Sequence, residues 1–143
     1  MTTEAAEIVE FNSAMTAFET KQFSTAAQLL TPFAEKGNAD AQHRCAIMFQ
    51  NGLGVAPNEE RALNYMKAAA EQGHAFAQHG LGFMYMEGEC VEKDAEEAMK
   101  WFKKAAEQDM VGSMTTIAMM YEEGKGVEKN PELAKEWYAK AGF

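Results

Sequence analysis

Histidine and glutamate residues at a regular spacing are the first candidates for chemistry in this chain. His43 and His79 lie 36 residues apart, and so do Glu87 and Glu123. Imidazole and carboxylate groups brought together could bind a divalent metal ion or exchange protons with a substrate. Two imidazoles alone make a weak metal site, because a stable site has three or four ligands. A metal-binding, small-molecule-binding or enzymatic groove that uses these four residues therefore stands only as an alternative.

Known catalytic patterns do not occur in the sequence. The glycine loop that begins at Gly52 joins two predicted helices and lacks the Lys-Ser/Thr pair of a phosphate-binding loop. No nucleophile elbow or His-Glu-x-x-His run is present. Cys45 and Cys90 are too far apart for a zinc motif, whose ligands pair two to four residues apart. We therefore expect a protein that is not an enzyme and that uses no cofactor and no metal.

The charge of the chain argues against some classes of partner. Its 22 acidic and 13 basic residues give a formal net charge of -9, which opposes binding to phosphate backbones and anionic lipids. No apolar stretch is long enough to cross a membrane, and the first residues do not combine a basic segment with an apolar run. The sequence thus predicts a cytoplasmic protein that binds neither nucleic acid nor membrane.

The 36-residue spacing of the two histidines belongs to a repeat that covers most of the chain. Methionine, glycine, valine and alanine recur at the same step, in the series Met48, Met84 and Met120, Gly52, Gly88 and Gly124, Val55, Val91 and Val127, and Ala62, Ala98 and Ala134. A unit this short cannot bury its own apolar face, so neighbouring copies must stack on one another. The period predicts a solenoid.

Each repeat contains the pattern of two helices. Ala77, Leu81 and Met84 keep the spacing of one helical stripe, and Gly88 is placed to end that helix. The second helix should begin where a side chain can accept from its free amides, at Asn58, Asp94 and Asn130. We therefore predict an all-α fold.

Residues 1–37 form a degenerate fourth unit. Phe18 lies eight residues before Ala26, whereas the matching Phe49 lies thirteen residues before Ala62, so the first loop is five residues shorter. The prediction is one solenoid domain of eight helices in four antiparallel pairs. Its units are residues 1–37, 38–73, 74–109 and 110–143.

The two cysteines fall at different phases of the repeat. Cys45 takes the place of Leu81 and Ile117, which predicts a buried thiol. Cys90 takes the place of a loop glycine, which predicts an exposed thiol.

The combined pattern resembles that of a known family. The motif Ala-x7-Phe/Tyr-x2-Gly-x-Gly-Val-x2-Asn/Asp-x3-Ala-x2-Tyr/Trp-x3-Ala-Ala occurs in three copies over residues 38–143, with departures at Cys90, Asp109 and Ser113. It is similar to the Sel-1-like repeats, relatives of the tetratricopeptide repeats, while residues 5–37 look closer to a plain tetratricopeptide unit. The resemblance implies a right-handed superhelix whose first helices line a concave groove. It also implies an adaptor or scaffold that holds partner proteins or peptides, often in bacteria.

The residues of the first helices that are offset from the packing stripe are the candidates for partner binding. They are His43, Ile47, Gln50, Phe76, His79, Phe83, Met86, Glu87, Thr115, Met119, Glu122 and Glu123. An apolar row flanked by carboxylates suits a helix or peptide with apolar anchors and basic flanks. The alternative is that this row packs against the protein itself, which would favour a structural or self-associating module.

The last helix suggests a second contact. The sequence given stops at Phe143, directly after that helix, without the polar capping helix that a solenoid normally has. Trp137 and Tyr138 would then leave an apolar end exposed. We expect self-association through that end, or a partner that covers it.

Overall fold

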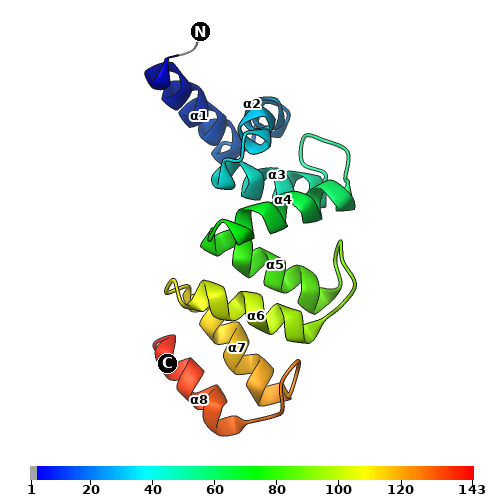
Figure 1. Cartoon of the computed structure of the whole chain (residues 1–143), viewed down its shortest axis with the longest axis vertical. Coiled ribbons are helices and arrows are strands. Elements are labelled where there is room, and N and C mark those ends of the chain that lie inside the picture. Colours follow the sequence, from blue (N-terminus) through cyan, green and yellow to red (C-terminus); the bar gives the residue numbers. More distant parts are fainter. Residues whose placement is uncertain (1–2) are drawn as a thin grey trace. The chain divides into compact units, whose positions relative to one another are not determined.

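Eight α-helices and no strand make up the part of the chain that the structure, a computed structural model, describes, residues 3–143 (Figure 1). The helices are α1 (Glu4–Glu19), α2 (Phe23–Glu35), α3 (Ala39–Asn51), α4 (Glu59–Glu71), α5 (Ala75–Glu87), α6 (Ala95–Ala106), α7 (Val111–Glu123) and α8 (Pro131–Lys140). Each odd-numbered helix packs against the next even-numbered one. The predicted all-α repeat fold and its eight helices are therefore confirmed.

The chain divides into two compact units, Met1–Gln72 and Gly73–Phe143. The first unit holds α1 to α4, and the second holds α5 to α8. None of the described helices is both long enough and apolar enough to span a bilayer.

The helix boundaries follow from capping residues at the predicted positions. The side chains of Asn58, Asp94 and Asn130 accept a hydrogen bond from the amide three residues later, at 3.0 to 3.1 Å. Gly52, Gly88 and Gly124 close the first helices in the left-handed conformation that glycine adopts easily. Local sequence therefore fixes where each repeat starts and turns.

Two residues that depart from the repeat keep the backbone that glycine would have. Cys90 and Asp109 have φ values of 64° and 63°, in the region that side chains other than glycine rarely adopt. Cys90 is also half-buried, so the prediction that it is exposed was wrong in degree. Cys45 is fully buried, as predicted.

Aromatic contacts close the first helix pair. The ring centroids of Phe18 and Phe23 are 5.6 Å apart beside the turn that joins the helices. Farther from this turn, the ring centroids of Phe11 and Phe33 are 5.3 Å apart. These two contacts show that α1 and α2 run antiparallel. The shortened loop leaves only three residues, 20–22, between the helices.

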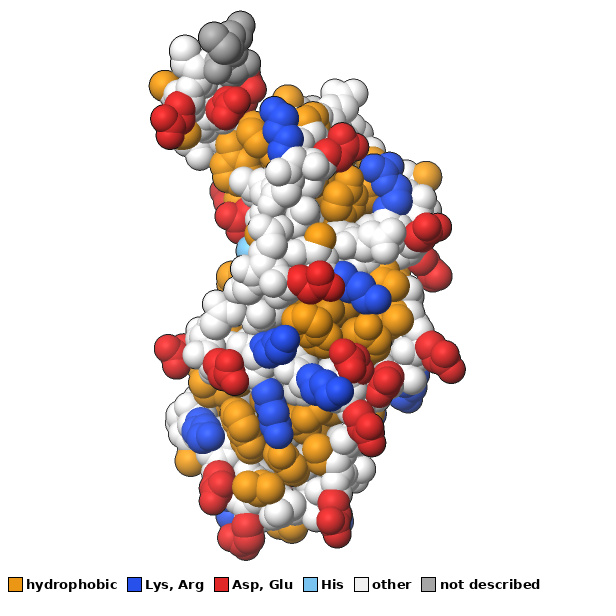
Figure 2. Space-filling view, in the orientation of Figure 1, with side chains coloured by type: hydrophobic (Ala, Val, Ile, Leu, Met, Phe, Trp, Pro, Cys, Tyr) orange, Lys and Arg blue, Asp and Glu red, His pale blue; other side chains and the backbone are white. Residues whose placement is uncertain are grey.

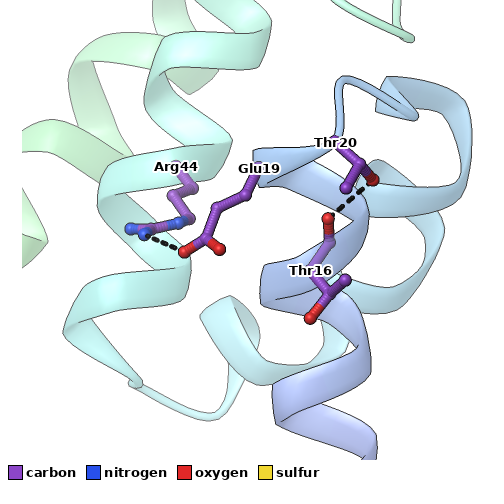
Figure 3. Close-up of polar contacts among 4 residues, drawn as sticks. All are labelled: Thr16, Glu19, Thr20 and Arg44. Carbon is purple, nitrogen blue, oxygen red and sulfur yellow. Dashed lines mark hydrogen bonds and ion pairs between the residues drawn. The ribbon is translucent and has the colours of Figure 1, made fainter.

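Polar contacts link α1 to α3 within the first unit (Figure 3). An Arg44 nitrogen lies 3.8 Å from a Glu19 carboxylate oxygen, and the guanidinium also lies over the Phe18 ring. The Thr20 hydroxyl donates to the Thr16 carbonyl at 2.8 Å and so helps to end α1. The first helices of the first two pairs, α1 and α3, are thus in direct contact.

The core of the second unit is built around Phe102 of α6, which is fully buried. A Cβ atom on Gly82 would lie 2.7 Å from this ring, so the absence of a side chain at Gly82 gives the ring its place. Met99, Met114 and Ile117 complete the contact between α6 and α7.

In each unit, a pair of glutamines 30 residues apart joins the first turn of one helix to the residues at the end of the helix that follows it. In the first unit, the Gln72 amide donates to the Gln42 oxygen at 2.7 Å, and the Gln42 amide donates to the Ala34 carbonyl. In the second unit, the Gln108 amide donates to the Gln78 oxygen at 2.9 Å. Gln42 and Gln78 are buried, so these bonds satisfy polar groups that would otherwise destabilise the core.

Candidate partner-binding site

A cavity of about 280 Å³ lies between α5 and α7, the two first helices of the second unit. Its lining residues are Phe83, Met86 and Glu87 of α5, Thr116, Met119, Met120 and Glu123 of α7, and Lys125 of the following loop. We call it the α5–α7 cavity.

Helical periodicity brings these side chains together. Positions 83, 86 and 87 of α5 follow the i, i+3, i+4 spacing of one helix face, and positions 116, 119, 120 and 123 of α7 do the same. Gly88 and Gly124 end both helices at the same phase, which places Glu87 and Glu123 in the last turn of each. The cavity is therefore apolar along its length, with both carboxylates at one end.

Burial distinguishes the floor of the cavity from its open surface. Met86 and Met120 are only 8% and 2% exposed and form the floor, whereas Met119 is 47% exposed. Phe83 is half-buried, and Glu87 and Glu123 are exposed. The cavity thus offers an apolar surface to an incoming side chain and keeps its charges in water.

His79 supports the cavity from within the protein. Its Nδ1 and the Ser113 hydroxyl share a hydrogen bond of 2.6 Å. The centroid of its ring lies 4.9 Å from that of Phe83 and 5.5 Å from that of Phe102. Burial lowers the pKa of His79 from its usual value, because desolvation disfavours the charged imidazolium. Ser113, a departure from the repeat, is completely buried and gives the imidazole its partner. His79 therefore packs against Phe83, one of the residues that line the cavity.

Five of the predicted binding residues meet at this cavity, namely Phe83, Met86, Glu87, Met119 and Glu123. Sequence reasoning missed Thr116, Met120 and Lys125. Met120 recurs at the repeat step and was therefore assigned to the framework alone. The i, i+3, i+4 spacing of α7 around Met119 was the signal that could have found Thr116 and Met120.

Other predicted residues of the second unit lie outside the cavity. Glu122 accepts a hydrogen bond from the Tyr138 hydroxyl at 2.9 Å, which joins α7 to α8. The Thr115 hydroxyl donates to the carbonyl of Val111 in its own helix. Phe76, at the start of α5, is 65% exposed and faces the His74 ring.

The remaining predicted residues belong to the first unit. His43, Ile47 and Gln50 all lie on α3, and each is half-buried. Across residues 3–143, no group of three or more His, Cys, Asp or Glu side chains is arranged to hold a metal ion.

Three segments of the chain, residues 39–74, 75–110 and 112–142, match the model of the Sel1 repeat. The chain belongs to the Sel1 repeat family. The predicted resemblance is therefore confirmed, and the helix pairs α3–α4, α5–α6 and α7–α8 are its Sel1 repeats. No curated protein matches the chain.

Solved structures give the same Sel1 assignment. A protective antigen of uropathogenic Escherichia coli strains that displays an SLR fold is 30% identical, with a TM-score of 0.89 over 96% of this chain and 30% of its own. A Sel1 repeat protein from Oxalobacter formigenes is 34% identical, with a TM-score of 0.83 over 90% of this chain and 53% of its own. The chain thus spans about a third and about half of these two relatives.

A third solved structure shares the fold alone. Helicobacter pylori cysteine rich protein B is 20% identical and superposes with a TM-score of 0.66 over 82% of this chain and 87% of its own. Unlike a cysteine-rich chain, this one has two cysteines, and neither forms a disulfide.

Proposed function

We propose that this protein is a non-catalytic adaptor that binds a partner protein or peptide by seating an apolar side chain in the α5–α7 cavity. Sel1 repeat proteins are generally protein-interaction modules and typically act as scaffolds without enzymatic activity. The observation that carries the proposal is the open apolar surface of Phe83 and Met119 above a methionine floor.

The size of the cavity defines the anchor. A volume of about 280 Å³ accommodates one large apolar side chain, such as leucine, methionine or phenylalanine, with room for part of the neighbouring residue. The floor is methionine, whose flexible and polarisable thioether adapts to anchors of different shape. Anchors that fill a desolvated pocket contribute most of the energy of such contacts.

Charge around the cavity defines the flanks. The carboxylates of Glu87 and Glu123 lie at its rim, so lysine or arginine beside the anchor would gain a favourable contact. Lys125 lies on the loop that follows α7 and favours an acidic or carbonyl group at that point. The net charge of -9 adds long-range attraction for a basic segment.

Selection from a displayed library of random peptides tests this function. We expect the selected peptides to carry one large apolar residue flanked by lysine or arginine, and to bind wild-type protein in calorimetric titrations. The Phe83→Lys/Met119→Lys variant should lose this binding and keep its helical circular dichroism, because both substitutions alter exposed or half-exposed side chains.

Val111→Lys is the matched control. Val111 is an exposed apolar residue of α7 that does not line the cavity, so this substitution should leave binding unchanged. Peptides that bind the double variant as tightly as the wild type would show that the α5–α7 cavity is not the binding site.

A further inference from the structure

The first helix pair has an apolar hollow of its own, in the unit that does not contain the α5–α7 cavity. It has a volume of about 290 Å³ and is lined along its length by Val9 of α1 and by Leu29, Pro32 and Phe33 of α2. Val9 is 65% exposed and Leu29 is 39% exposed, although both are large apolar side chains. In the space-filling view, apolar side chains lie open among charged ones over this helix pair (Figure 2). We call this surface the α1–α2 face.

The charges of the α1–α2 face are divided between its two helices. Glu7 and Glu10 line the hollow from α1, and Lys36 lines it from the end of α2. Because the helices are antiparallel, the beginning of α1 and the end of α2 lie at the same end of the pair. One end of the face thus carries acidic groups on one side and a basic group on the other.

This division makes the face complementary to itself. A two-fold rotation about an axis parallel to the helices places α1 of one copy over α2 of a second copy, with equivalent ends together. Glu7 and Glu10 of each copy then lie near Lys36 of the other, and Val9 and Leu29 of both copies lie within the contact. Such a contact uses the same patch on both copies, which is the arrangement of a two-fold dimer. We propose that the α1–α2 face binds a second copy of this chain as a symmetric dimer.

The face of α8 that corresponds to the α6–α7 contact differs from α6 at two positions. In α6, Met99 and Phe102 make the apolar contact with the next helix, α7. The corresponding positions of α8 are Lys135, which is exposed, and Tyr138, whose hydroxyl is already bonded to Glu122. An ammonium group replaces the apolar contact there, so the dimer is assigned to the other end of the chain.

The helix lengths indicate how strong the contact is. The 16 residues of α1 and 13 residues of α2 give helices about 24 and 20 Å long. Two helices side by side then bury on the order of 1,000 Å² in total, near the lower limit for a specific interface. We expect a dissociation constant in roughly the micromolar range, with monomers at high dilution.

Charge reversal tests the symmetry directly by sedimentation equilibrium of the full chain. The Glu7→Lys/Glu10→Lys variant and the Lys36→Glu variant should each be monomeric at concentrations where the wild type is dimeric, because like charges then face one another. An equimolar mixture of the two should dimerise, since each lysine set meets a glutamate set across the contact. Leu29→Glu should be monomeric alone and in every mixture.

Lys135→Glu, at the exposed face of α8, is the control and should remain dimeric. A wild type that stays monomeric at about 100 μM, well above the expected dissociation constant, overturns the proposal. So does a mixture of the two charge variants that stays monomeric. Dimers or longer assemblies that are lost with Lys135→Glu would instead indicate head-to-tail association through α8. Circular dichroism of each variant identifies any loss of helix.

Discussion

His79 is a partly buried histidine whose contacts all lie within the second unit. It lies on α5, where its ring contacts Phe83 of the same helix and Phe102 of α6 and is hydrogen-bonded to Ser113 of α7. Its neighbours are aromatic rings and a hydroxyl, so only desolvation acts on its pKa. The imidazole is therefore suited to remain neutral in the folded protein.

The lowered pKa of His79 predicts a loss of stability in acid. The unfolded imidazole takes up a proton below about pH 6.5, while the folded one resists protonation until a lower pH. The stabilisation due to the neutral ring is thus complete above about pH 6.5 and is lost as the pH falls through the folded pKa. Urea unfolding of wild type and His79→Gln should show a difference in unfolding free energy that shrinks on acidification. A difference that does not change with pH would contradict this role.

The contact between Gly82 and Phe102 predicts a large effect from one methyl group. A Cβ atom at Gly82 would meet the buried ring at 2.7 Å, so Gly82→Ala should destabilise the protein by about 1–3 kcal/mol. Gly112→Ala is the control in α7, since its Cβ would meet His79 only at 3.5 Å. Alanine there should be neutral or stabilising by up to about 1 kcal/mol. Equal effects in thermal unfolding would mean that the ring moves aside.

At the scale of the helices, the repeats differ in how the start of their first helix is capped. Asn38 and His74 cap α3 and α5 with their side chains, but Met110, at the start of α7, provides no such bond. The first turn of α7 is therefore the least well capped among the described first helices. This turn carries Ser113, which holds His79.

Replacing Met110 with asparagine should stabilise α7. The new side chain can accept from the free amides of the first turn, which contributes about 0.5–1 kcal/mol. The opposite change at α8, Asn130→Ala, removes an existing cap and should cost about 1 kcal/mol. Chemical denaturation of both variants measures the two effects. A Met110→Asn variant less stable than wild type would show that the packing of methionine outweighs the cap.

Helix boundaries could be predicted from sequence because their causes are local, whereas the lining of the candidate site depends on contacts that the repeat does not specify. Asn58 and Gly88 act on amides and carbonyls a few residues away, so their pattern was sufficient. Met86 and Glu122 occupy the same phase of the repeat and were predicted to act alike. Met86 lines the α5–α7 cavity, while Glu122 bonds to Tyr138 of α8. The repeat period indicates that two residues lie on equivalent helix faces, but it does not indicate which neighbouring helix packs over each of them.

At the scale of the whole molecule, each of the two units closes its own polar network. The glutamine bond of the first unit joins Gln42 to Gln72, and that of the second joins Gln78 to Gln108. Each bond begins and ends within one Sel1 repeat. Other polar contacts cross the repeat boundaries, from Gln42 to Ala34 and from His79 to Ser113, so a repeat depends on its neighbours for polar contacts as well as for apolar burial.

The recurrence of the same glutamine bond in successive repeats predicts that a repeat can be duplicated. A chain in which residues 75–110 occur twice in tandem should fold with the same helical content per residue as the wild type. Its melting temperature should be no lower, and its denaturant dependence should be steeper, because more surface is exposed on unfolding. Circular dichroism and urea unfolding measure both. A lower melting temperature would show that residues 75–110 fit only one neighbour.

Cys45 gives the first unit a built-in reporter of its own opening. The thiol is completely buried, and desolvation raises its pKa to about 11, so almost no reactive thiolate is present near neutral pH. An alkylating reagent can reach it only when the unit transiently opens. In a Cys90→Ser variant, the rate at which Cys45 is labelled would measure how often that happens in the native protein. Labelling as fast as that of a small-molecule thiol would mean that the first unit opens so often that Cys45 is not protected in solution.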